Sequence, residues 1–297
     1  MHFATLNVEL TTSRSTARLR DAAVSLGHSI TLLAATDLTL ALNEGGAVAL
    51  CRREPLPQFD GIIPRVSAAS NPFGLSVLEH FESSGVTSLN LSKSIYASHD
   101  KLHTLRLLRQ NGIPIPPTVA VHRPNELANA LQLLGESPVV VKTVLGSQGV
   151  GVMLAETRAS AIAIAETMLA NRLPVLIQPF FGEAEGTDIR AFVVGDTVAA
   201  AMRRTARPGE FRSNLHRGGS AQPVILEPAL QDLARRSTHA LGLRVAGVDI
   251  IETRIGPLVL EVNSSPGLSG IEAATGVDVA TPIITLLEAL ISDSRRS

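Results

Sequence analysis

Short apolar runs alternate with amphipathic segments along the first ninety residues. Runs of strand length occur at HFATLNV, HSITLLAA, FDGIIPRV and VTSLN, with helical spacing in STARLRDAAVSLG and in residues 73–84. Strands that alternate with helices at this interval predict a parallel sheet covered on both faces, here a Rossmann-like domain over residues 1–97. The first strand leads into NVELTTSR and not into G-x-G-x-x-G, which disfavours a nicotinamide dehydrogenase.

The hydrophobic pattern changes after residue 97, and we expect a second domain over residues 98–181. A predicted helix runs from Ser98 to a stop at Asn111-Gly112, and IPIPP then marks a linker or a sharp crossing. Strands are predicted in TVAVHR, PVVVKTV, VGVMLAE and PVLIQPFF, and helices in PNELANALQLLG and ASAIAIAETMLA. This order predicts an α+β subdomain with a glycine-rich turn between two of its strands.

Residues 182–297 are expected to form a third part. Two antiparallel strands, DIRAFVVGD and TVAAAMRRTA, are joined at Gly195-Asp196, and the polar loop RPGEFRSNLHRGG follows them. A helix in EPALQDLARRSTHALGL, a hairpin in VAGVDIIETRIGPLVLEVN and one final helix with a charged tail complete the chain. The whole pattern predicts an α/β (α+β) protein.

Composition and charge narrow the class of protein. The chain has 297 residues, of which 45% are hydrophobic, so it can bury a large core. Its 26 cations against 27 anions argue against direct binding of nucleic acid, and the absence of a long apolar run argues against a membrane protein. We expect a cytoplasmic enzyme. The single cysteine, Cys51, is expected to be a small buried or half-buried residue and not a nucleophile.

The stretch VVVKTVLGSQGVGVML carries the first chemical signal. Lys142 precedes Gly146, Gly149 and Gly151, whereas the lysine of a Walker-type phosphate loop follows its glycines. The apolar runs on both sides predict strand, turn, strand, and a glycine turn lets backbone N–H groups approach phosphate oxygens. Only three of the 26 cations are lysines, Lys93, Lys101 and Lys142, and either phosphate binding or chance accounts for them.

Arg65 carries the second signal, because it follows IIP at the carboxyl end of a predicted parallel strand. Ligands of open α/β sheets bind at that edge, so Arg65 is either a contact for an acidic substrate or a surface arginine.

The hairpin at residues 245–263 carries the third signal. With Arg254 to Gly256 as the turn, Asp249 lies opposite Glu261, and Asn263 projects from the same face of its strand. Two opposed carboxylates repel each other, so a cation is expected between them. The oxygen-only donor set favours Mg²⁺ or Mn²⁺ over zinc.

Seven ordered segments together resemble the ATP-grasp superfamily, and within it the RimK-type ligases that add glutamate to a carboxyl terminus. The segments are FDGIIPR, DKL at 100–102, VVVKTVLGSQGVGV, GTDIRAFVVGD, GEFRSNLHRGG at 209–219, VAGVDI and LEVNSSPGLSGIE. The resemblance covers nearly the whole chain. It implies an ATP-grasp architecture, in which a Rossmann-like N-terminal domain precedes two α+β subdomains that clasp ATP.

The resemblance also implies a role for each matching position. The backbone of the strand ending at Pro179-Phe180 would read the adenine edge, with the N–H of Phe180 as a donor, although the usual glutamate is replaced by Pro179. The expected catalytic residues are Arg190, Arg203 and Arg212, the metal ligands are Asp249, Glu261 and Asn263, and tentative substrate contacts are Arg65, His216 and Arg217. The expected ATP contacts are Lys101, Lys142, Gly146, Ser147, Gln148, Gly149, Gly151, Gln178, Pro179, Phe180, Asp188, Arg212, Ser213 and Asn214.

The implied reaction is an ADP-forming ligation through an acyl phosphate, with ATP and two Mg²⁺ or Mn²⁺ ions. The resemblance to RimK-type ligases implies L-glutamate as the amine. It implies a protein or peptide C-terminus, such as that of a ribosomal protein, as the acceptor. A small-molecule or carrier-protein carboxylate is the alternative acceptor, because the shared motifs handle ATP and not the substrate. A regulator that binds nucleotide without catalysis is a further alternative. A homo-oligomer is expected.

Overall fold

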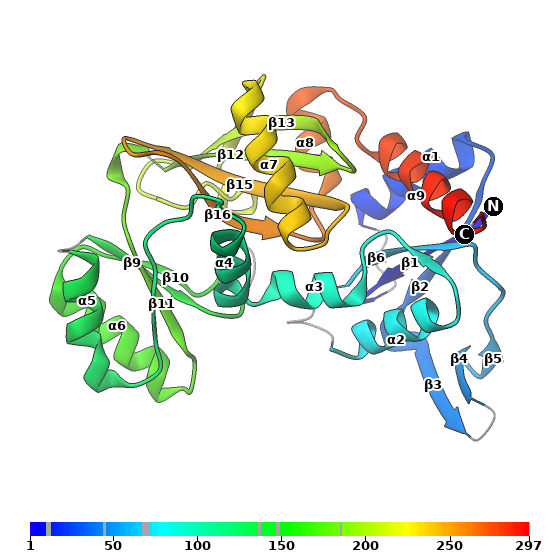
Figure 1. The fold of residues 1–297 in the computed structure, drawn as a ribbon, viewed down its shortest axis with the longest axis horizontal. Coiled ribbons are helices and arrows are strands. Elements are labelled where there is room, and N and C mark those ends of the chain that lie inside the picture. The colour runs from blue at the N-terminus through cyan, green and yellow to red at the C-terminus, as the bar shows by residue number, and fades with distance from the viewer. Residues whose placement is uncertain are drawn as a thin grey trace.

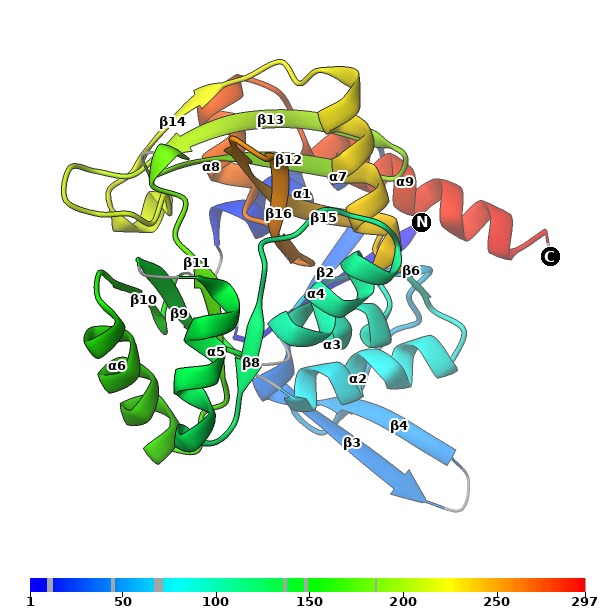
Figure 2. The ribbon, with the colours of Figure 1, turned by 60° about the vertical axis from the view of Figure 1, so that its left-hand side comes forward.

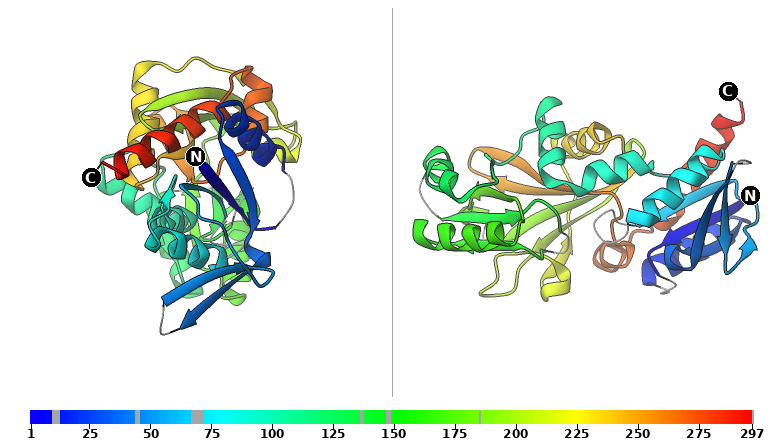
Figure 3. Two further views of the ribbon diagram at one scale, coloured as in Figure 1. Left: turned by 90° about the vertical axis from the view of Figure 1, so that its right-hand side faces the viewer. Right: turned by 90° about the horizontal axis from the view of Figure 1, so that it is seen from below.

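The structure is a computed structural model of the chain, and it describes residues 1–9, 13–43, 46–66, 72–135, 138–146, 149–184 and 186–296. The side chains of Asn43 and His216 lie outside this description. The molecule is elongated (Figure 1). The sheet that contains the N-terminus lies at one end, a lobe built from residues 119–179 lies at the other, and the remaining large sheet lies between them, as Figure 3 also shows from below.

The N-terminal sheet is parallel, with the strand order β2-β1-β6-β7. Its strands are β1 (His2–Asn7), β2 (Ser29–Ala34), β6 (Gly61–Arg65) and β7 (Thr87–Ser88). Helix α1 (Arg14–Ser25) packs on the face that carries Phe3 and Ile63, and α2 (Pro72–Ser83) packs on the face that carries Leu6 and Ile62. The predicted parallel sheet with two covered faces is therefore confirmed.

A small antiparallel sheet that the pattern did not predict follows β2. It contains β3 (Leu38–Asn43), β4 (Gly46–Cys51) and β5 (Glu54–Pro55), joined to β2 by a single 3₁₀ turn, η1 (Ala35–Asp37). The β3–β4 hairpin projects from the body of the molecule (Figure 2) and leaves Leu42 80% exposed. The leucines Leu38, Leu40 and Leu42 alternate along β3, which is the pattern of a strand, but this stretch was not among the predicted strands. Cys51 is half-buried, as expected.

The helix predicted from Ser98 is confirmed over Lys101–Gln110, but it begins three residues later than expected, because an unpredicted helix ends just before it. Helix α3 (Ser92–His99) ends and α4 (Lys101–Gln110) begins at Asp100, whose backbone is extended with φ −84° and ψ 107°. The Asp100 carboxylate accepts a hydrogen bond from the N–H of His103 at 2.8 Å, and so caps α4. The predicted stop is confirmed, because Gly112 has a φ of +68°. The break places Lys101 at the first position of α4.

The second sheet is antiparallel, with the order β10-β9-β11-β8. Its strands are β8 (Val119–Val121), β9 (Val139–Thr143), β10 (Val152–Ala155) and β11 (Val175–Pro179). The turn η2 (Pro124–Glu126) leads into α5 (Leu127–Leu134), which with α6 (Arg158–Ala170) covers the face carrying Val141 and Ile177. Because strand side chains alternate, Lys142 and Gln178 project from the opposite face.

The third sheet is antiparallel, with the order β14-β13-β12-β15-β16. Its strands are β12 (Thr187–Val194), β13 (Thr197–Thr205), β14 (Ser220–Pro223), β15 (Val245–Thr253) and β16 (Gly256–Asn263), and short turns η3 (Gly182–Ala184) and η4 (Leu215–Arg217) accompany them. Val194 pairs with Thr197, which confirms the predicted turn at Gly195-Asp196. Helix α7 (Pro228–Ala240) packs on the face that carries Ile189 and Ile250.

The final helix predicted at the C-terminus is confirmed, but an additional helix that was not predicted precedes it. Helix α8 (Leu268–Thr275) ends at Gly276, which has a φ of +71°, and α9 (Ala280–Ser294) follows. Ile284 and Leu287 of α9 belong to one core cluster with Leu19 of α1, so the last helix joins the third sheet to the N-terminal sheet.

A buried asparagine strengthens the same junction. The amide nitrogen of Asn90 donates to the carbonyls of Val245 and Ser264, at 2.8 and 3.0 Å. Its Oδ1 accepts from the backbone N–H groups of Arg244 and Val245, at 2.8 and 3.1 Å. The N-terminal sheet and the third sheet are thus held together by both apolar packing and hydrogen bonds. Within the described part of the chain, no helix combines the length and the apolar character needed to cross a membrane.

Candidate active site

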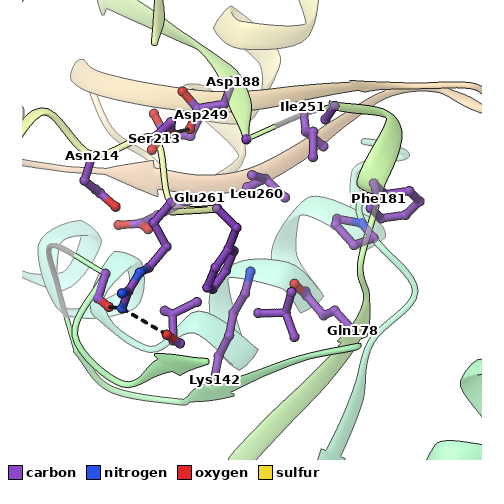
Figure 4. Close-up of a pocket in the computed structure, with 18 of the residues that line it drawn as sticks. Lys142, Gln178, Phe181, Asp188, Ser213, Asn214, Asp249, Ile251, Leu260 and Glu261 are labelled. Carbon is purple, nitrogen blue, oxygen red and sulfur yellow. Dashed lines mark hydrogen bonds between the residues drawn. The ribbon is translucent and has the colours of Figure 1, made fainter. Parts of the chain in front are cut away.

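A cavity separates the second sheet from the third, and it encloses about 1030 Å³ of empty space, part of it open to solvent. Figure 4 shows Lys142 and Gln178 rising from one wall, with Asp188, Asp249 and Glu261 on the facing wall. Thirteen of the predicted site residues line this cavity, namely Lys101, Lys142, Gly146, Gly149, Gln178, Pro179, Phe180, Asp188, Arg212, Ser213, Asn214, Asp249 and Glu261.

Both lysines of this site are partly removed from water. Burial lowers the pKa of Lys142 to about 8, with Glu261 acting to raise it and Lys101 to lower it. Burial also lowers the pKa of Lys101, although Glu261 and Asp100 oppose the shift. The Lys101 Nζ donates to the carbonyl of Gly146 at 2.7 Å, which ties the start of α4 to the glycine turn. Two partly desolvated cations in one cavity favour an anionic ligand.

The glycine turn needs glycine for two physical reasons. Gly149 and Gly151 both have a φ of +72°, a conformation that other residues rarely adopt. A Cβ on Gly151 would lie 2.5 Å from Oγ1 of Thr143, and one on Gly149 would lie 2.9 Å from Oδ1 of Asn214. The backbone of the turn therefore lies directly against its neighbours. Ser147 and Gln148, two predicted ATP contacts, lie outside the described residues.

The loop at residues 207–219 contacts the glycine turn through Arg212. Its Nη1 donates to the carbonyls of Gly149 and Val152 at 3.0 and 3.1 Å. Glu210 holds the guanidinium from the other side, with Nε–Oε1 and Nη2–Oε2 distances of 2.9 and 2.8 Å. The hydrogen bond from Arg212 lowers the pKa of Glu210 to about 2, against the opposing effect of burial. Arg212 and Glu210 thus connect the third sheet to the turn that covers the cavity.

A buried network of charges forms the facing wall. Arg204 donates to both oxygens of Asp188, at 2.7 and 2.6 Å, and its Nη2 lies 2.8 Å from Oδ2 of Asp249. Arg190 donates to both oxygens of Asp249, and Ser213 donates to Asp188 at 2.6 Å. Burial alone would raise the pKa of Asp249, but the two arginines outweigh it and the net shift is downward. Asp249 is therefore ionised.

The prediction that Arg203 joins this group is wrong. Cross-strand pairing places Arg203 beside Ile189 on the face covered by α7, and its Nη2 lies 2.6 Å from Glu252 in an exposed ion pair. Its neighbour Arg204, which the sequence reasoning missed, occupies the expected place and pairs with Asp188. Counting back from the two-residue turn would pair Asp188 with Arg203. A β-bulge near Phe192 shifts the pairing by one residue, so that Asp188 pairs with Arg204 instead.

The predicted facing of Asp249 and Glu261 is confirmed, although the turn beside it is not as expected. The turn contains only Arg254 and Ile255, because Thr253 pairs with Gly256. A bulge between Asp249 and Ile250 then restores the pairing of Asp249 with Glu261. The third predicted ligand, Asn263, is not among the residues that line the cavity, and its Oδ1 accepts from the N–H of Ser265 at 2.9 Å.

The donor set fits a divalent cation that is shared with a phosphate ligand. Within the described ranges, no group of three or more His, Cys, Asp and Glu side chains could hold a metal ion by itself. Asp249 and Glu261 provide two carboxylates, and Oδ1 of Asp249 keeps a lone pair because it accepts from Arg190 alone, whereas Oδ2 meets both Arg190 and Arg204. Mg²⁺ is typically bound by one or two carboxylates together with substrate phosphates, which matches this arrangement.

The end of β11 departs from the expected adenine contact. The N–H of Phe180, expected to donate to the base, donates to the carbonyl of Pro138 at 3.0 Å. This donor is therefore occupied within the protein. Gln178 also lines the cavity, and its amide nitrogen donates to Thr118 at 2.8 Å. Apolar side chains that the sequence reasoning did not select contribute to the cavity wall, among them Phe181, Phe211, Ile251 and Leu260.

Of the predicted substrate residues, Arg65 and Arg217 do not line this cavity. Arg65 lines a separate cavity at the end of β6, and the Nη1 of Arg217 lies 3.8 Å from Glu210 beside the loop. Among the described residues, the buried Nε of Arg217 has no hydrogen-bond partner. The side chain of His216 lies outside the description. Gly151 adjoins the cavity through the turn without lining it, and Arg190 reaches it through Asp249.

Two family models together match most of the chain. The RimK PreATP-grasp domain matches residues 1–95, and the RimK-like ATP-grasp domain matches residues 98–287. A Shewanella frigidimarina protein named "Probable alpha-L-glutamate ligase 1" is 46% identical over 92% of this chain and 91% of its own length. A Nitrosococcus oceani protein named "Probable alpha-L-glutamate ligase" is 44% identical with the same coverage.

Solved structures agree with this fold. The crystal structure of a RimK domain ATP-grasp protein from Sphaerobacter thermophilus is 25% identical, with a TM-score of 0.75 over 97% of this chain and 99% of that chain. A D-alanine–D-alanine ligase from Bacillus anthracis, 18% identical, has a TM-score of 0.72 over 100% and 99%, and shows the same fold. The predicted ATP-grasp architecture is confirmed, and this chain belongs to the RimK-like ATP-grasp family of ATP-dependent carboxylate–amine ligases.

Proposed function

We propose that the chain joins L-glutamate to the C-terminal carboxylate of a protein or peptide, with ATP cleaved to ADP and phosphate. The observation that carries the proposal is the cavity between the two sheets. Two partly desolvated lysines form one wall, and Asp249, Glu261 and Arg204 form the other, with Arg190 behind Asp249. The names of relatives more than 40% identical support glutamate as the amine.

Nucleotide would lie with its base near Gln178 and Phe181 and its phosphates near Lys101 and Lys142, under the glycine turn. The turn and Arg212 would limit access of water to the phosphates. Asp249 and Glu261 would hold one or two Mg²⁺ or Mn²⁺ ions. When bound, these ions would neutralise negative charge on the phosphates.

The chemistry follows in two balanced steps. An oxygen of the acceptor carboxylate attacks the γ-phosphorus, the bond to the β-phosphate oxygen breaks, and ADP leaves. The neutral amine of glutamate then attacks the carbonyl carbon of the acyl phosphate. Phosphate leaves with the bonding electron pair, and the nitrogen loses a proton. Arg190, held beside Asp249, and Arg212, held by Glu210, are preorganised cations for the developing negative charge.

The acceptor is the finer part of the proposal. A ribosomal protein C-terminus as acceptor and a homo-oligomeric state follow from the resemblance to RimK-type ligases and stay predictions. Transfer of the amino acid to a small-molecule or carrier-protein carboxylate would use the same ATP chemistry, because the cavity residues described above act on the nucleotide and on the activated carboxylate alone.

A product screen tests the proposal. The purified chain is incubated with ATP, Mg²⁺ and each of the twenty amino acids, with peptides whose C-terminus is either free or amidated. We expect glutamate-dependent release of ADP and a mass increase of one or more glutamyl residues on the free peptide only. Modification of the amidated peptide, or formation of AMP and pyrophosphate as the coupled products, would contradict the proposal.

A further inference from the structure

A second cavity opens at the carboxyl ends of the two central strands of the N-terminal sheet. Asn7 ends β1 and Arg65 ends β6, and the two residues are direct partners in the parallel register. With Val8, Glu9 and Ser13 they line a space of about 690 Å³ that is open to solvent. This edge of an open α/β sheet is where ligands commonly bind, and the volume is sufficient for an amino acid.

Arg65 forms no ion pair with any residue that the structure describes. Its Nη1 donates to the carbonyl of Pro266 at 2.9 Å, which fixes the guanidinium without neutralising it. Among the described residues, no carboxylate lies within 4.0 Å of it, and burial alone lowers its pKa, to about 10. An uncharged side chain could donate the same single hydrogen bond to the carbonyl of Pro266, so this contact alone does not require a charged arginine. A partly desolvated cation without a counter-ion is costly unless a ligand supplies the opposite charge.

The cavity adjoins the active site through Pro266. A Cβ on Gly247 would lie 3.0 Å from both Cβ of Pro266 and Cδ of Arg190, so these two side chains lie against the same glycine. Arg190 in turn holds Asp249 in the main cavity. Only Pro266 and Arg190 therefore lie between Arg65 and Asp249 in the main cavity.

We propose that Arg65 binds a carboxylate of the incoming amino acid, one that does not react. This inference rests on the proposed ligation, in which only the amine of the donor reacts and its carboxylates need cationic partners. The acceptor carboxylate must instead lie beside the nucleotide phosphates. Glu9, exposed on the same cavity, disfavours a bare anion such as phosphate and suits a ligand that also carries an ammonium group.

Two variants separate substrate binding from support of the fold. Arg65→Gln keeps an N–H that can donate toward Pro266 but removes the charge. Arg244→Gln is the matched control, because Arg244 also joins the two domains by donating to a backbone carbonyl, that of Ser88 at 2.9 Å. We expect Arg65→Gln to raise the KM for glutamate about ten- to a hundredfold, the loss of one charge-assisted hydrogen-bonding partner. The KM for ATP should stay within twofold in both variants.

The outcome distinguishes the possible sources of the carboxylate. A rise in the KM for the acceptor peptide with an unchanged KM for glutamate would overturn the proposal in favour of an acceptor contact. Equal changes in Arg65→Gln and Arg244→Gln would show a purely structural role and also overturn it.

Binding is measured independently of turnover, so that failure of the proposed reaction does not hide the result. Each of the twenty amino acids is titrated against wild type and both variants, with thermal stabilisation as the readout. The proposal requires that an amino acid stabilises wild type and Arg244→Gln, but stabilises Arg65→Gln at least tenfold less effectively. Stabilisation of no form by any amino acid would refute it. If the expected pattern appears with an amino acid other than glutamate, the carboxylate site stands and the choice of glutamate fails.

Discussion

Replacing Lys142 by methionine removes a cation that the folded protein holds at a cost. Burial is the largest influence on this ammonium group and lowers its pKa from 10.5 to about 8. The unfolded chain therefore binds more protons than the folded chain between pH 8 and pH 10.5. By linkage, stability rises as pH increases through this interval, and the cost of the charge is fully present below about pH 8. Lys142→Met should stabilise the nucleotide-free protein by about 1 to 3 kcal/mol at pH 7.

The same shift makes nucleotide binding depend on pH. Phosphates near Lys142 favour its charged form, so binding above pH 8 should take up a proton. At pH 9 about one tenth of the free protein keeps this charge, and affinity should fall about tenfold for each pH unit above 8, or about 1.4 kcal/mol. Calorimetric titration of a non-hydrolysable ATP analogue, in buffers of different ionisation enthalpy, measures both the affinity and the proton uptake. Uptake should approach one proton at pH 9.

Two controls make this result specific. Lys142→Met should bind the analogue more weakly at pH 7.5 and lose most of the proton uptake. Lys101→Met should retain most of the proton uptake, because Lys142 is still present, although burial lowers the pKa of Lys101 as well. An affinity of the wild type that is constant from pH 7.5 to 9.5 would refute the reasoning. So would equal thermal stability of wild type and Lys142→Met at pH 7, because the lysine would then be solvated in the folded state.

Three further predictions concern the facing wall and the domain junction. Arg204→Ala should cost about 3 to 5 kcal/mol in chemical denaturation, because it removes the cation that two buried carboxylates share and leaves Asp188 with Ser213 alone. Arg203→Ala should cost less than about 1 kcal/mol, because its ion pair is exposed, and similar losses in the two variants would contradict this placement. Asp249→Asn and Glu261→Gln should each lower kcat more than a hundredfold with an unchanged circular dichroism spectrum, and full turnover at ordinary Mg²⁺ concentration would exclude the metal site. Asn90→Ala should destabilise by about 2 to 4 kcal/mol, since four hydrogen bonds are lost in a buried position, and an unchanged melting temperature would contradict this.

The local sequence pattern was sufficient to predict most helices and strands of this fold and part of the candidate active site. The alternation of apolar runs and helical spacing located the parallel sheet, and the glycines around Lys142 located the turn over the cavity. These features depend on neighbouring residues alone, because strand alternation and glycine backbone freedom are local properties. The β3–β4 hairpin was not predicted, although Leu38, Leu40 and Leu42 show the alternation of a strand.

Tertiary structure decided the features that depend on register and on competition for hydrogen bonds. A bulge near Phe192 determines that Arg204, and not Arg203, meets Asp188, and a second bulge beside Asp249 keeps it opposite Glu261 although the turn is one residue shorter than expected. A bulge moves every following side chain by one position, and a turn sequence does not reveal where it occurs. Likewise, only the folded chain shows that the carbonyl of Pro138 accepts from the N–H of Phe180, and that Arg65 has no carboxylate partner among the described residues. Both facts depend on residues brought together from distant segments.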